Sequence, residues 1–549
     1  MTQRRKTGWF ASGDPWIWLT ASAVAAAIVM VVGLLTLIAY RGMGHFWPHT
    51  VVQFEYSIDG AKSVLAGEVR DSDLIPAARA RDAGLPVAED AEPVTRLLIK
   101  AGNRDVTRED FVWIAEPFIA NQSIPENMVV FERREWGNLY GFIDLQSGQS
   151  HEQAWQAVEQ AIERSNELHE RIEALQKGEI GGINYQLERL RLRQRALELD
   201  GEDTPQALAE LEQERQALNA AYNEAEQRLT AMYEQFGDES VAVTTAPGVK
   251  LDQSVRHIVR AYRPNAMSLP QKLGHYVAKF WEFISDDPRE ANTEGGVFPA
   301  IFGTVLMVLL MSVLVAPLGV IAALYLREYA KQGILTRTIS IAVNNLAGVP
   351  SIVYGVFGLG FFVYTLGGSI DALFYPEALP SPTFGTGGLM WASVTLALLT
   401  LPVVIVSTEE GLTRIPRAIR EGSLALGATQ AETLWRTVIP MASPAIMTGV
   451  ILAVARAAGE VAPLMLVGVV KLAPSLPLDL NYPFFHPDRK FMHLGFHIYD
   501  VGFQSPNVEA ARPLVYATAL LLVAVIVLLN LVAIRVRNRL REKYRALEN

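Results

Sequence analysis

Hydrophobic and polar positions divide the chain into several apolar runs and one long polar stretch. An α-helix needs about 20 apolar residues to cross a bilayer, and six runs meet that length. They lie at about residues 16–40, 299–326, 339–366, 388–408, 443–470 and 513–535. Residues 41–298, between the first and the second run, have the mixed pattern of a water-soluble protein. The pattern therefore predicts an all-α polytopic membrane core of six transmembrane helices with one large polar insertion.

The first apolar run is expected to stay in the mature protein as an anchor. It is longer than the core of a signal peptide, and no small-residue cleavage site follows it. Lys and Arg residues precede this run, lie in the connections after the second and fourth runs, and fill the C-terminal tail, whereas residues 367–387 contain none. Because short basic loops stay in the cytoplasm, we expect both termini inside the cell and residues 41–298 outside it.

The polar insertion has two different patterns. Residues 50–145 contain short β-rich runs separated by Gly and Pro, which predicts a small α+β unit. Residues 150–236 have the three-and-four spacing of a coiled-coil seam, and the polar stretch Asp200–Pro205 divides them into two arms, which predicts a helical hairpin. The seam of the second arm consists of Leu208, Leu211, Arg215, Leu218, Tyr222, Ala225, Leu229 and Met232.

The formal net charge of −10 is concentrated in the predicted hairpin. Residues 150–240 contain 20 Asp and Glu against 9 Lys and Arg. Such a segment repels anions, so it is not expected to collect an anionic ligand. Two interpretations stay open, a docking post for a partner and a solvated stalk. The chain has no cysteine, which excludes disulfides, thiolate metal sites and cysteine nucleophiles.

The connection between the fourth and fifth runs has the local signals of two helices joined by a sharp turn. Gly427 is suited to the left-handed conformation that ends a helix. Thr429 and Glu432 have the spacing of a capping box, which begins the next helix. Residues 421–440 are therefore predicted to form a rigid docking element on the cytoplasmic face.

This connection resembles the "EAA" loop of the membrane subunits of ABC importers, which reads Glu-Ala-Ala, three residues, Gly, nine residues, Ile-x-Leu-Pro. Glu421, Gly427 and Pro440 match at that spacing. The positions that differ from the consensus are Gly422, Ser423, Thr437 and Ile439. The resemblance implies that residues 421–436 couple to a separate ATPase subunit; a plain connector between two spans is the alternative. The implied coupling residues are Glu421, Gly427, Ala428, Thr429, Glu432, Arg436 and Pro440.

Four further segments resemble the phosphate-specific transport (Pst) permease family, in particular its A-type subunit. They are Gly295–Thr304, Pro317–Tyr329, Leu346–Gly355 and Ala455–Pro463. The resemblance implies a MetI-like permease core in a bacterial inner membrane that imports inorganic phosphate without a cofactor. It also implies three partners: a homologous but non-identical permease subunit, an ATP-binding subunit dimer and a periplasmic phosphate-binding protein. The insertion is similar to an extra domain of longer family members, which assigns it no function.

Arg456 and Glu460 are charged residues within the fifth apolar run. Their spacing of four is expected to place them on one helix face. A charge at the centre of a bilayer costs from about 3 to over 10 kcal/mol, so Arg456 should face a partner or an aqueous path. Arginine is suited to bind a tetrahedral oxyanion through two parallel N–H bonds, and Glu460 is placed to neutralise it when no anion is bound. The alternative is an ion pair that only holds spans or subunits together.

Neutral polar residues and prolines complete the candidate path. Asn344, Asn345 and Ser351 offer donors in the third run, although hydrogen bonding between helices is the more common role of such residues. Kinks are expected at the prolines of spans two to five. These prolines are Pro317, Pro350, Pro402 and Pro463.

Other chemistry is not indicated by the sequence. The chain has no Gly-x4-Gly-Lys-Ser/Thr loop, so any ATP must be hydrolysed by another chain and this chain is not expected to be an enzyme. His493 and His497 are four apart but lack the Glu of a zinc protease motif, and no metal site is predicted. The basic tail has the composition of a membrane flank, so no nucleic-acid binding is expected.

The predicted organisation has four parts. They are a cytoplasmic N-terminus with the first span (1–40), the periplasmic insertion (41–298), a five-span permease core (299–540) and a cytoplasmic tail (541–549). Two alternatives to phosphate import remain open at this stage: a permease for another oxyanion such as sulfate or molybdate, and a membrane sensor or scaffold that does not transport.

Overall fold

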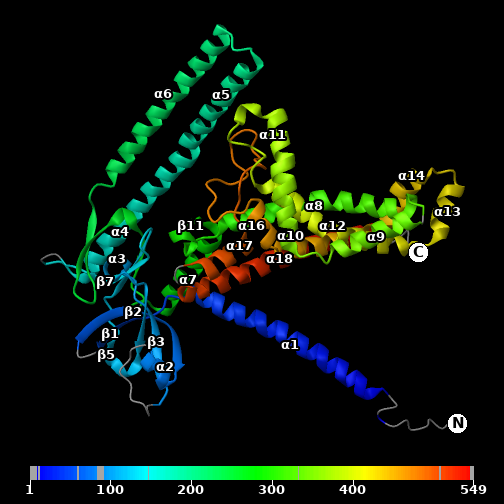
Figure 1. Cartoon of the computed structure of the whole chain (residues 1–549). Coiled ribbons are helices and arrows are strands. Elements are labelled where there is room, and N and C mark those ends of the chain that lie inside the picture. Colours follow the sequence, from blue (N-terminus) through cyan, green and yellow to red (C-terminus); the bar gives the residue numbers. More distant parts are fainter. Residues whose placement is uncertain are drawn as a thin grey trace.

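Six helices long and apolar enough to cross a membrane run through the computed structural model (Figure 1). The structure describes Trp9 and residues 13–58, 61–82, 92–145, 148–331, 333–505 and 508–544. Within these residues the membrane-length helices are Asp14–Gly44, Phe298–Tyr329, Ser351–Phe374, Leu389–Thr413, Gln430–Ala458 and Ala511–Glu542. The prediction of a six-span helical core is confirmed.

The bundle is built from long helices with short helices between them. The long helices are α1 (Asp14–Gly44), α8 (Phe298–Leu324), α12 (Leu389–Thr413), α15 (Ile439–Ala458) and α18 (Val508–Tyr544). The third span joins α10 (Ser351–Phe357), a π-helical segment (Gly358–Gly367) and α11 (Gly368–Phe374). The short helices are α9 (Ile334–Leu346), α13 (Arg417–Ala425), α14 (Gln430–Thr433), α16 (Ala462–Val467) and α17 (Leu494–Tyr499). π-helical turns follow α8 at Tyr325–Tyr329, α14 at Leu434–Val438 and α17 at Asp500–Gln504.

Two predicted spans have other bounds in the structure. The prediction of one helix over 339–366 is wrong, because α9 ends at Leu346 and α10 begins after Pro350. Proline lacks the N–H that would continue the helical ladder. The predicted span 443–470 ends early for the same reason: α15 stops at Ala458, and Pro463 in the first turn of α16 has no N–H for the carbonyl of Gly459.

α12 is the central helix of the bundle. It packs against both α8 and α15, and its Leu396 and Leu399 are buried. Glycines let the backbones approach closely: a Cβ added at Gly319 of α8 would lie 2.6 Å from Cγ1 of Val404, and one at Gly449 of α15 would lie 2.7 Å from Cβ of Ser407. Small residues at helix crossings are typical of membrane bundles, where close backbone packing replaces the hydrophobic effect.

α1 joins the bundle only near one end. Its residues 16–37 are exposed, whereas Gly42 is buried. A Cβ added at Gly42 would lie 2.9 Å from backbone atoms of Tyr516 in α18, and Arg41 lies over the ring of Tyr516. Figure 1 shows α1 diverging from α18 away from this contact.

The insertion contains two five-stranded sheets. The first has the order β4-β3-β2-β1-β5 and the second the order β10-β6-β7-β8-β9. Their strands are β1 (Val51–Ile58), β2 (Ala61–Ile75), β3 (Val94–Lys100), β4 (Phe111–Ala115), β5 (Ile119–Ser123), β6 (Val129–Arg133), β7 (Asn138–Ile143), β8 (Ser240–Thr244), β9 (Lys250–Ser254) and β10 (Ile258–Tyr262). Short helices α2 (Ala77–Asp82) and α3 (Arg104–Thr107) connect strands of the first sheet. The predicted α+β unit at 50–145 lacks β8 to β10, which complete the second sheet after the hairpin.

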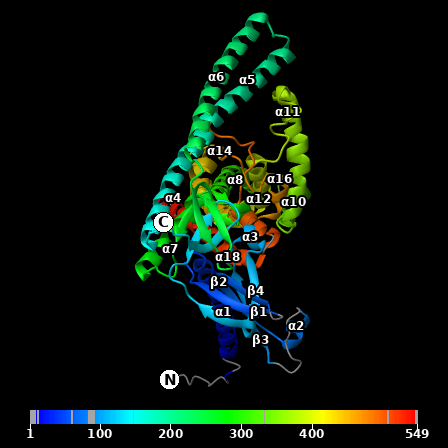
Figure 2. The same cartoon turned by 90° about the vertical axis from the view of Figure 1, so that its left-hand side faces the viewer.

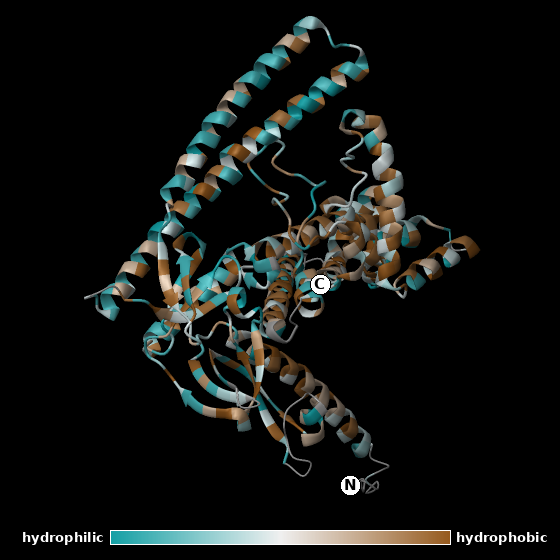
Figure 3. Ribbon diagram, turned by 60° about the vertical axis from the view of Figure 1, so that its left-hand side comes forward, coloured by the Kyte–Doolittle hydropathy of each residue, from teal (hydrophilic) through white to brown (hydrophobic). Residues whose placement is uncertain are grey.

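A long helical hairpin leaves the second sheet between β7 and β8 (Figures 1 and 2). It consists of α4 (His151–Ala174), a π-helical turn (Leu175–Ile180), α5 (Gly181–Asp200) and α6 (Pro205–Gln235). Gly201, at a φ of 71°, ends α5, and Thr204 caps α6 by accepting from the N–H of Ala207. Apolar side chains such as Leu187, Leu218 and Tyr222 fill the seam between the arms. Figure 3 shows that the hairpin is mostly hydrophilic outside this seam, in contrast to the bundle.

The lower part of α5 rests on the connection between α16 and α17. The ring of Tyr185 lies 5.7 Å from that of His486, and the guanidinium of Arg189 lies 5.3 Å from the ring of Tyr482. Asp479 organises this connection by accepting from Arg489 at 2.5 Å and from the Asn481 N–H at 2.9 Å. Although burial opposes it, these hydrogen bonds lower the pKa of Asp479 to about 2.

Helix α7 (Leu269–Ser285) links the second sheet to the bundle. The short strands β11 (Pro288–Arg289) and β12 (Glu294–Gly295) pair between α7 and α8. The N–H of Val297 donates to the carbonyl of Phe283 at 2.8 Å, and that of Phe298 donates to the carbonyl of Asp286 at 3.2 Å. The end of α7 is therefore hydrogen-bonded to the start of a membrane-spanning helix.

Candidate functional site: a coupling segment and a charged pair

The coupling segment, residues 417–440, has the helix-turn-helix geometry that its local signals predict. Gly427 has a φ of +89°, and the Ala428 N–H donates to the carbonyl of Ser423 at 3.3 Å to close α13. Thr429 begins α14: its N–H donates to Oε2 of Glu432 at 2.9 Å, and its Oγ1 accepts from the N–H of Glu432 at 3.3 Å. The turn is therefore fixed by left-handed backbone on one side and a capping box on the other.

Buried contacts attach this segment to the bundle. Ser423 Oγ and Thr433 Oγ1 are 2.8 Å apart and hold the two short helices together. Leu434 and Val438 pack against Leu324 and Leu412, at the ends of α8 and α12. Apolar packing therefore joins the coupling segment to the ends of two spans.

Arg420 is an anchor that sequence reasoning missed. Its guanidinium donates to Oε1 of Glu328 at 2.9 Å and to the carbonyl oxygens of Leu412 at 2.8 Å and Ile415 at 3.0 Å. Three acceptors from the ends of α8 and α12 thus surround one side chain in the middle of α13. Its partner Glu328 is 92 residues away along the chain, so spacing alone carries no signal for the pair.

The tip of the coupling segment presents apolar side chains to its surroundings. Leu426 is 92% exposed and Trp435 is 66% exposed. Glu421, Glu432 and Arg436 of the predicted coupling set are exposed as well, whereas Ala428 and Pro440 are half-buried. Exposed apolar groups rimmed by charges are typical of a surface that binds another protein.

Arg456 and Glu460 form an ion pair, but not in the middle of a span. Arg456 lies in the last turn of α15, and Glu460 follows the end of that helix. Nε of Arg456 is 3.6 Å from Oε1 of Glu460, longer than the roughly 2.7–2.9 Å of a tight charge-assisted hydrogen bond. The expectation that both residues share one helix face is wrong for Glu460, because the helix has ended; the turn after Ala458 brings the two groups together instead.

Arg456 lies near the break between α9 and α10. Tyr354 of α10 belongs to the same buried cluster as Ala457, the neighbour of Arg456, and its hydroxyl donates to the carbonyl of Leu346, the last residue of α9, at 2.7 Å. Gly355 contacts Pro463 of α16, where an added Cβ would lie 2.7 Å from the proline Cα. The charged pair lies between the end of α15 and the start of α16, and the dipoles of such helix ends are suited to ions.

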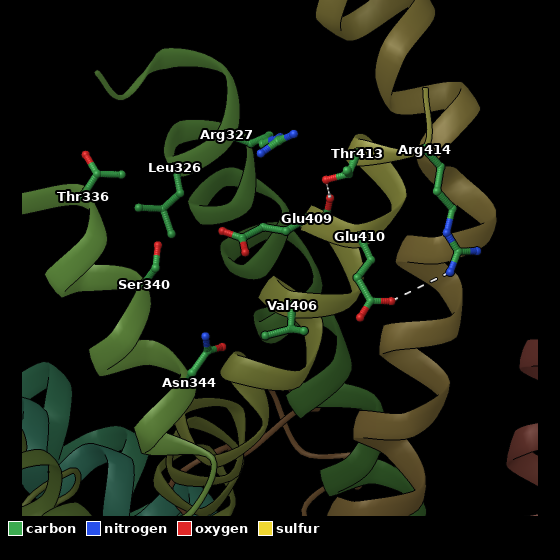
Figure 4. A pocket seen from close by; sticks show the side chains of 10 residues that line it. All are labelled: Leu326, Arg327, Thr336, Ser340, Asn344, Val406, Glu409, Glu410, Thr413 and Arg414. Atoms are coloured by element: carbon green, nitrogen blue, oxygen red, sulfur yellow. Dashed lines mark hydrogen bonds and ion pairs between the residues drawn. The ribbon is translucent and has the colours of Figure 1, made fainter. Parts of the chain in front are cut away.

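The neutral candidates Asn344, Asn345 and Ser351 do not gather around this pair as one cluster. Asn344 lines a pocket of about 640 Å³ between α9 and α12 (Figure 4). Its polar walls also include Ser340, Glu409 and Arg327, and neither Arg456 nor Glu460 contributes to it. Asn345 is exposed on α9, and Ser351 is half-buried in the first turn of α10.

The predicted prolines lie inside helices or at helix starts, and the two predicted histidines are buried. Pro317 and Pro402 lie inside α8 and α12, while Pro350 and Pro463 mark helix starts. His493 and His497 are both buried around α17, and Nδ1 of His493 caps that helix by accepting from the N–H of Gly495 at 3.1 Å. Among the described residues no group of three or more His, Asp or Glu is placed to hold a metal ion.

Comparisons with known proteins agree with this architecture. Residues 315–545 match the family described as the binding-protein-dependent transport system inner membrane component. Phosphate transport system permease protein PstA 1 of Mycobacterium tuberculosis (strain CDC 1551 / Oshkosh) is 35% identical over 244 residues, 44% of this chain and 71% of that protein. Probable ABC transporter permease protein YqgH of Bacillus subtilis (strain 168) is 31% identical over 242 residues, 44% of this chain and 69% of that protein. An inward-facing MetNI methionine ABC transporter structure covers 50% of this chain and 99% of its own, at 20% identity and a TM-score of 0.33.

The membrane helices, the coupling segment and the family match define the permease subunit of an ABC importer, a multi-pass inner membrane protein that does not itself hydrolyse ATP. Within this class, the chain belongs to the PstA family of phosphate transport system permeases. The family match lies within the permease core, and the M. tuberculosis relative aligns with 44% of this chain.

Proposed function

We propose that this chain forms one half of the pathway by which an ATP-driven importer moves inorganic phosphate across the inner membrane. The observation that carries the proposal is the loosely paired Arg456 among helix ends. With its guanidinium 3.6 Å from Glu460, Arg456 keeps N–H donors available for a tetrahedral oxyanion. The M. tuberculosis relative is a phosphate transport system permease, which supports phosphate as that anion.

Glu460 gives the site a way to release its anion. When phosphate leaves, the carboxylate neutralises Arg456 and spares the protein an unpaired charge in a low-dielectric region. When phosphate binds, it competes with Glu460 for the same donors. Asn344, Asn345 and Ser351 serve in this proposal as uncharged donors farther along the path, with Asn344 in the pocket that Arg327 and Glu409 also line.

The coupling segment is the proposed contact with an ATP-binding subunit dimer. The exposed Leu426 and Trp435 supply apolar contacts, and Glu421, Glu432 and Arg436 surround them with charge. Gly427, Ala428, Thr429 and Pro440 set the shape of the segment. Since Arg420 links the segment to α8 and α12, closure of the ATPase dimer would move these spans as a rigid body.

The remaining proposed partners are a homologous permease subunit and a periplasmic phosphate-binding protein. Apolar residues of α9 and α10 such as Ile341, Val353 and Val356 are exposed, which suits a homologous permease subunit completing the path. A periplasmic phosphate-binding protein would deliver the anion on the side of the insertion. We place both termini in the cytoplasm because basic residues follow the positive-inside rule and because α13, α14 and the far end of α18 lie at one end of the bundle (Figure 1).

Uptake of labelled phosphate by the assembled transporter in proteoliposomes tests the proposal. One charge-assisted hydrogen bond contributes about 1.5–3 kcal/mol, so Arg456→Ala should lower uptake at least about tenfold while the subunits still co-purify. Arg456→Lys keeps the positive charge but lacks the planar guanidinium, so its uptake should lie between that of Arg456→Ala and that of the wild type. Competition by sulfate or molybdate equal to that by phosphate would point to another oxyanion. Unchanged uptake by Arg456→Ala would remove this residue from the path, and a wild-type complex without uptake would favour a sensor or scaffold.

A further inference from the structure

The face of helix α7 that packs against the rest of the chain carries its charged residues together with Phe280 and Phe283, whereas its opposite face is exposed and apolar. On a surface helix of a soluble protein the opposite arrangement is expected, because the apolar stripe normally faces the core. The difference between the two faces of α7 therefore indicates which environment each face contacts.

The inward face of α7 is held by ion pairs. Glu282 is buried, and its carboxylate lies 2.5 Å from Arg289 Nη2 and 3.2 Å from Arg260 Nη2. Lys279 contacts both Glu282, at 3.2 Å, and the buried Glu132 of β6, at 2.5 Å. These contacts fix the rotation of α7 about its axis, since turning the helix would expose or unpair the buried charges.

The outward face of α7 is an uncharged stripe. Leu269, Leu273, Val277 and Trp281 recur every four residues and are respectively 64%, 50%, 64% and 68% exposed. The other exposed residues of α7 are Pro270, Gln271, Gly274, Ala278 and Ser285, so this face carries no charge. Residues at this spacing line one side of a helix.

We propose that α7 lies in the outer interface of the membrane, with this stripe inserted among the headgroups and upper acyl chains of the lipid. The inference concerns the insertion and does not depend on which anion is transported. Amphipathic helices that bind a membrane surface bury an apolar face to a depth of about 5–10 Å while their polar face stays outside the acyl chains.

The position of α7 argues for lipid as the occupant. Its last turn is hydrogen-bonded to the first residues of the membrane-spanning α8, through Val297 and Phe298. Phe46, just beyond the end of the membrane-spanning α1, packs against Phe280 and Phe283. The centroid of its ring lies 5.5 Å from that of Phe280 and 5.2 Å from that of Phe283. Figure 1 shows α7 at the end of the bundle where the insertion begins. The stripe thus lies beside the ends of two membrane-spanning helices, where lipid is the expected neighbour.

Aromatic residues around α7 match the composition of a membrane interface. Trp281 is exposed on the stripe, and Trp47 lies 6.1 Å from Tyr276 between the ring centroids. Trp and Tyr are enriched at the level of the headgroups, where an amphipathic ring meets both phases. Contact with lipid along α7 would give the insertion a fixed height above the bilayer.

Site-directed spin labelling tests this proposal, and the absence of native cysteine makes single-site labelling direct. Val277→Cys on the stripe is compared with Ala217→Cys, an exposed position on α6 of the hairpin. The assembled transporter is reconstituted in phospholipid vesicles, and the accessibility of each label to oxygen and to a water-soluble nickel chelate is measured. A Trp281→Cys label provides a second reading one turn along the same face.

In lipid, the labels at 277 and 281 should favour oxygen over the nickel chelate by several-fold, whereas the label at 217 should favour the chelate. Three results would each overturn the proposal. Chelate access at 277 equal to that at 217 would mean that the stripe faces water. Low access to both reagents with an immobilised label would mean that another protein chain covers it. Opposite preferences at 277 and 281 would mean that the face is not a single lipid contact.

Discussion

Nη2 of Arg420 lies 2.9 Å from Oε1 of Glu328, so a charge-assisted hydrogen bond ties the coupling segment to the end of α8. Both side chains are mostly buried, and the two further bonds from Arg420 to carbonyl oxygens of Leu412 and Ile415 reach the end of α12. This one residue connects the surface proposed to contact the ATPase with two spans of the bundle.

Replacing Arg420 by Ala should uncouple ATP hydrolysis from transport. The change removes bonds worth about 1.5–3 kcal/mol each and leaves Glu328 unpaired, so α13 is no longer held against α8. We expect phosphate uptake to fall at least about tenfold while ATPase activity of the complex persists. Arg417→Ala is a matched control, because Arg417 lies three residues earlier in α13 with an exposed side chain. Equal losses of uptake in both variants would contradict this role of Arg420.

The left-handed turn at Gly427 should tolerate no side chain, although there is space for one. No atom lies within 4 Å of an added Cβ, but a φ of +89° strains any residue other than Gly by about 1–2 kcal/mol. Gly427→Ala should therefore distort the coupling segment and reduce the binding of the ATPase subunits, measured by co-purification.

Gly422→Ala is the control for that substitution. Gly422 lies inside α13, and its added Cβ also meets nothing within 4 Å. Because Ala favours a helix by up to about 1 kcal/mol over Gly, this variant should bind the ATPase subunits at least as well as the wild type. Equal binding of the ATPase subunits by Gly427→Ala and Gly422→Ala would contradict the prediction.

The buried His493 should make the folded protein sensitive to acid. Burial lowers its pKa from 6.5 to about 3. Above pH 6.5 the ring is neutral in both states, and its full contribution to stability is present. As the pH falls below 6.5 the unfolded chain binds a proton that the folded chain does not, so about 1.4 kcal/mol of stability is lost per pH unit until about pH 3.

His493→Asn tests the acid sensitivity without removing the helix cap. Asn is a good N-cap residue and is able to accept from the N–H of Gly495 as His493 does. The unfolding midpoint in detergent should fall less steeply between pH 6.5 and 4.5 in the variant than in the wild type. His497 has a pKa lowered to about 4, chiefly by burial, and continues to contribute its own slope. Identical slopes would show that His493 takes up its proton in the folded state.

The contact between Arg189 and Tyr482 should stabilise the connection that carries Asp479. A cation–π contact contributes about 0.5–1 kcal/mol at an exposed site. In Arg189→Ala, amide hydrogen exchange in residues 476–488 should therefore be up to about fivefold faster, as measured by mass spectrometry. Arg193→Ala, at an exposed position one turn farther along α5, should leave the exchange unchanged. If neither variant changes it, α5 does not hold the connection.

Local features of the fold could be predicted from the sequence, and contacts between distant segments could not. Gly427, Thr429 and Glu432 act through backbone within a few residues, so their spacing was sufficient to predict the turn. The second sheet was missed because β7 pairs with β8, about a hundred residues later in the chain, through Phe142 opposite Thr244. The contact between Arg420 and Glu328 could not be predicted for the same reason, because 92 residues separate the two.

The sequence predicted that Arg456 and Glu460 would come together, but not their depth in the membrane. The unusual presence of Arg456 and Glu460 in an apolar run indicated a site, and they do form an ion pair. Their depth was misjudged because hydropathy continued through Gly459 to Pro463, where proline and the turn end the helix. A signal for α7 was also available: Leu269, Leu273, Val277 and Trp281 recur every four residues. Nothing in that spacing distinguishes an outward stripe from a core-facing one, which the burial of Glu282 settles.

The close approach of α1 to α18, at Gly42 against Tyr516, separates two kinds of sequence constraint within one helix. Near Gly42 only the smallest residue lets the two backbones meet. Over residues 16–37, where the helix is exposed, the sequence is constrained only in its length and hydrophobicity. An unrelated span grafted ahead of Gly42 should therefore be accepted as a replacement, which makes this part of the chain a convenient place to attach reporters.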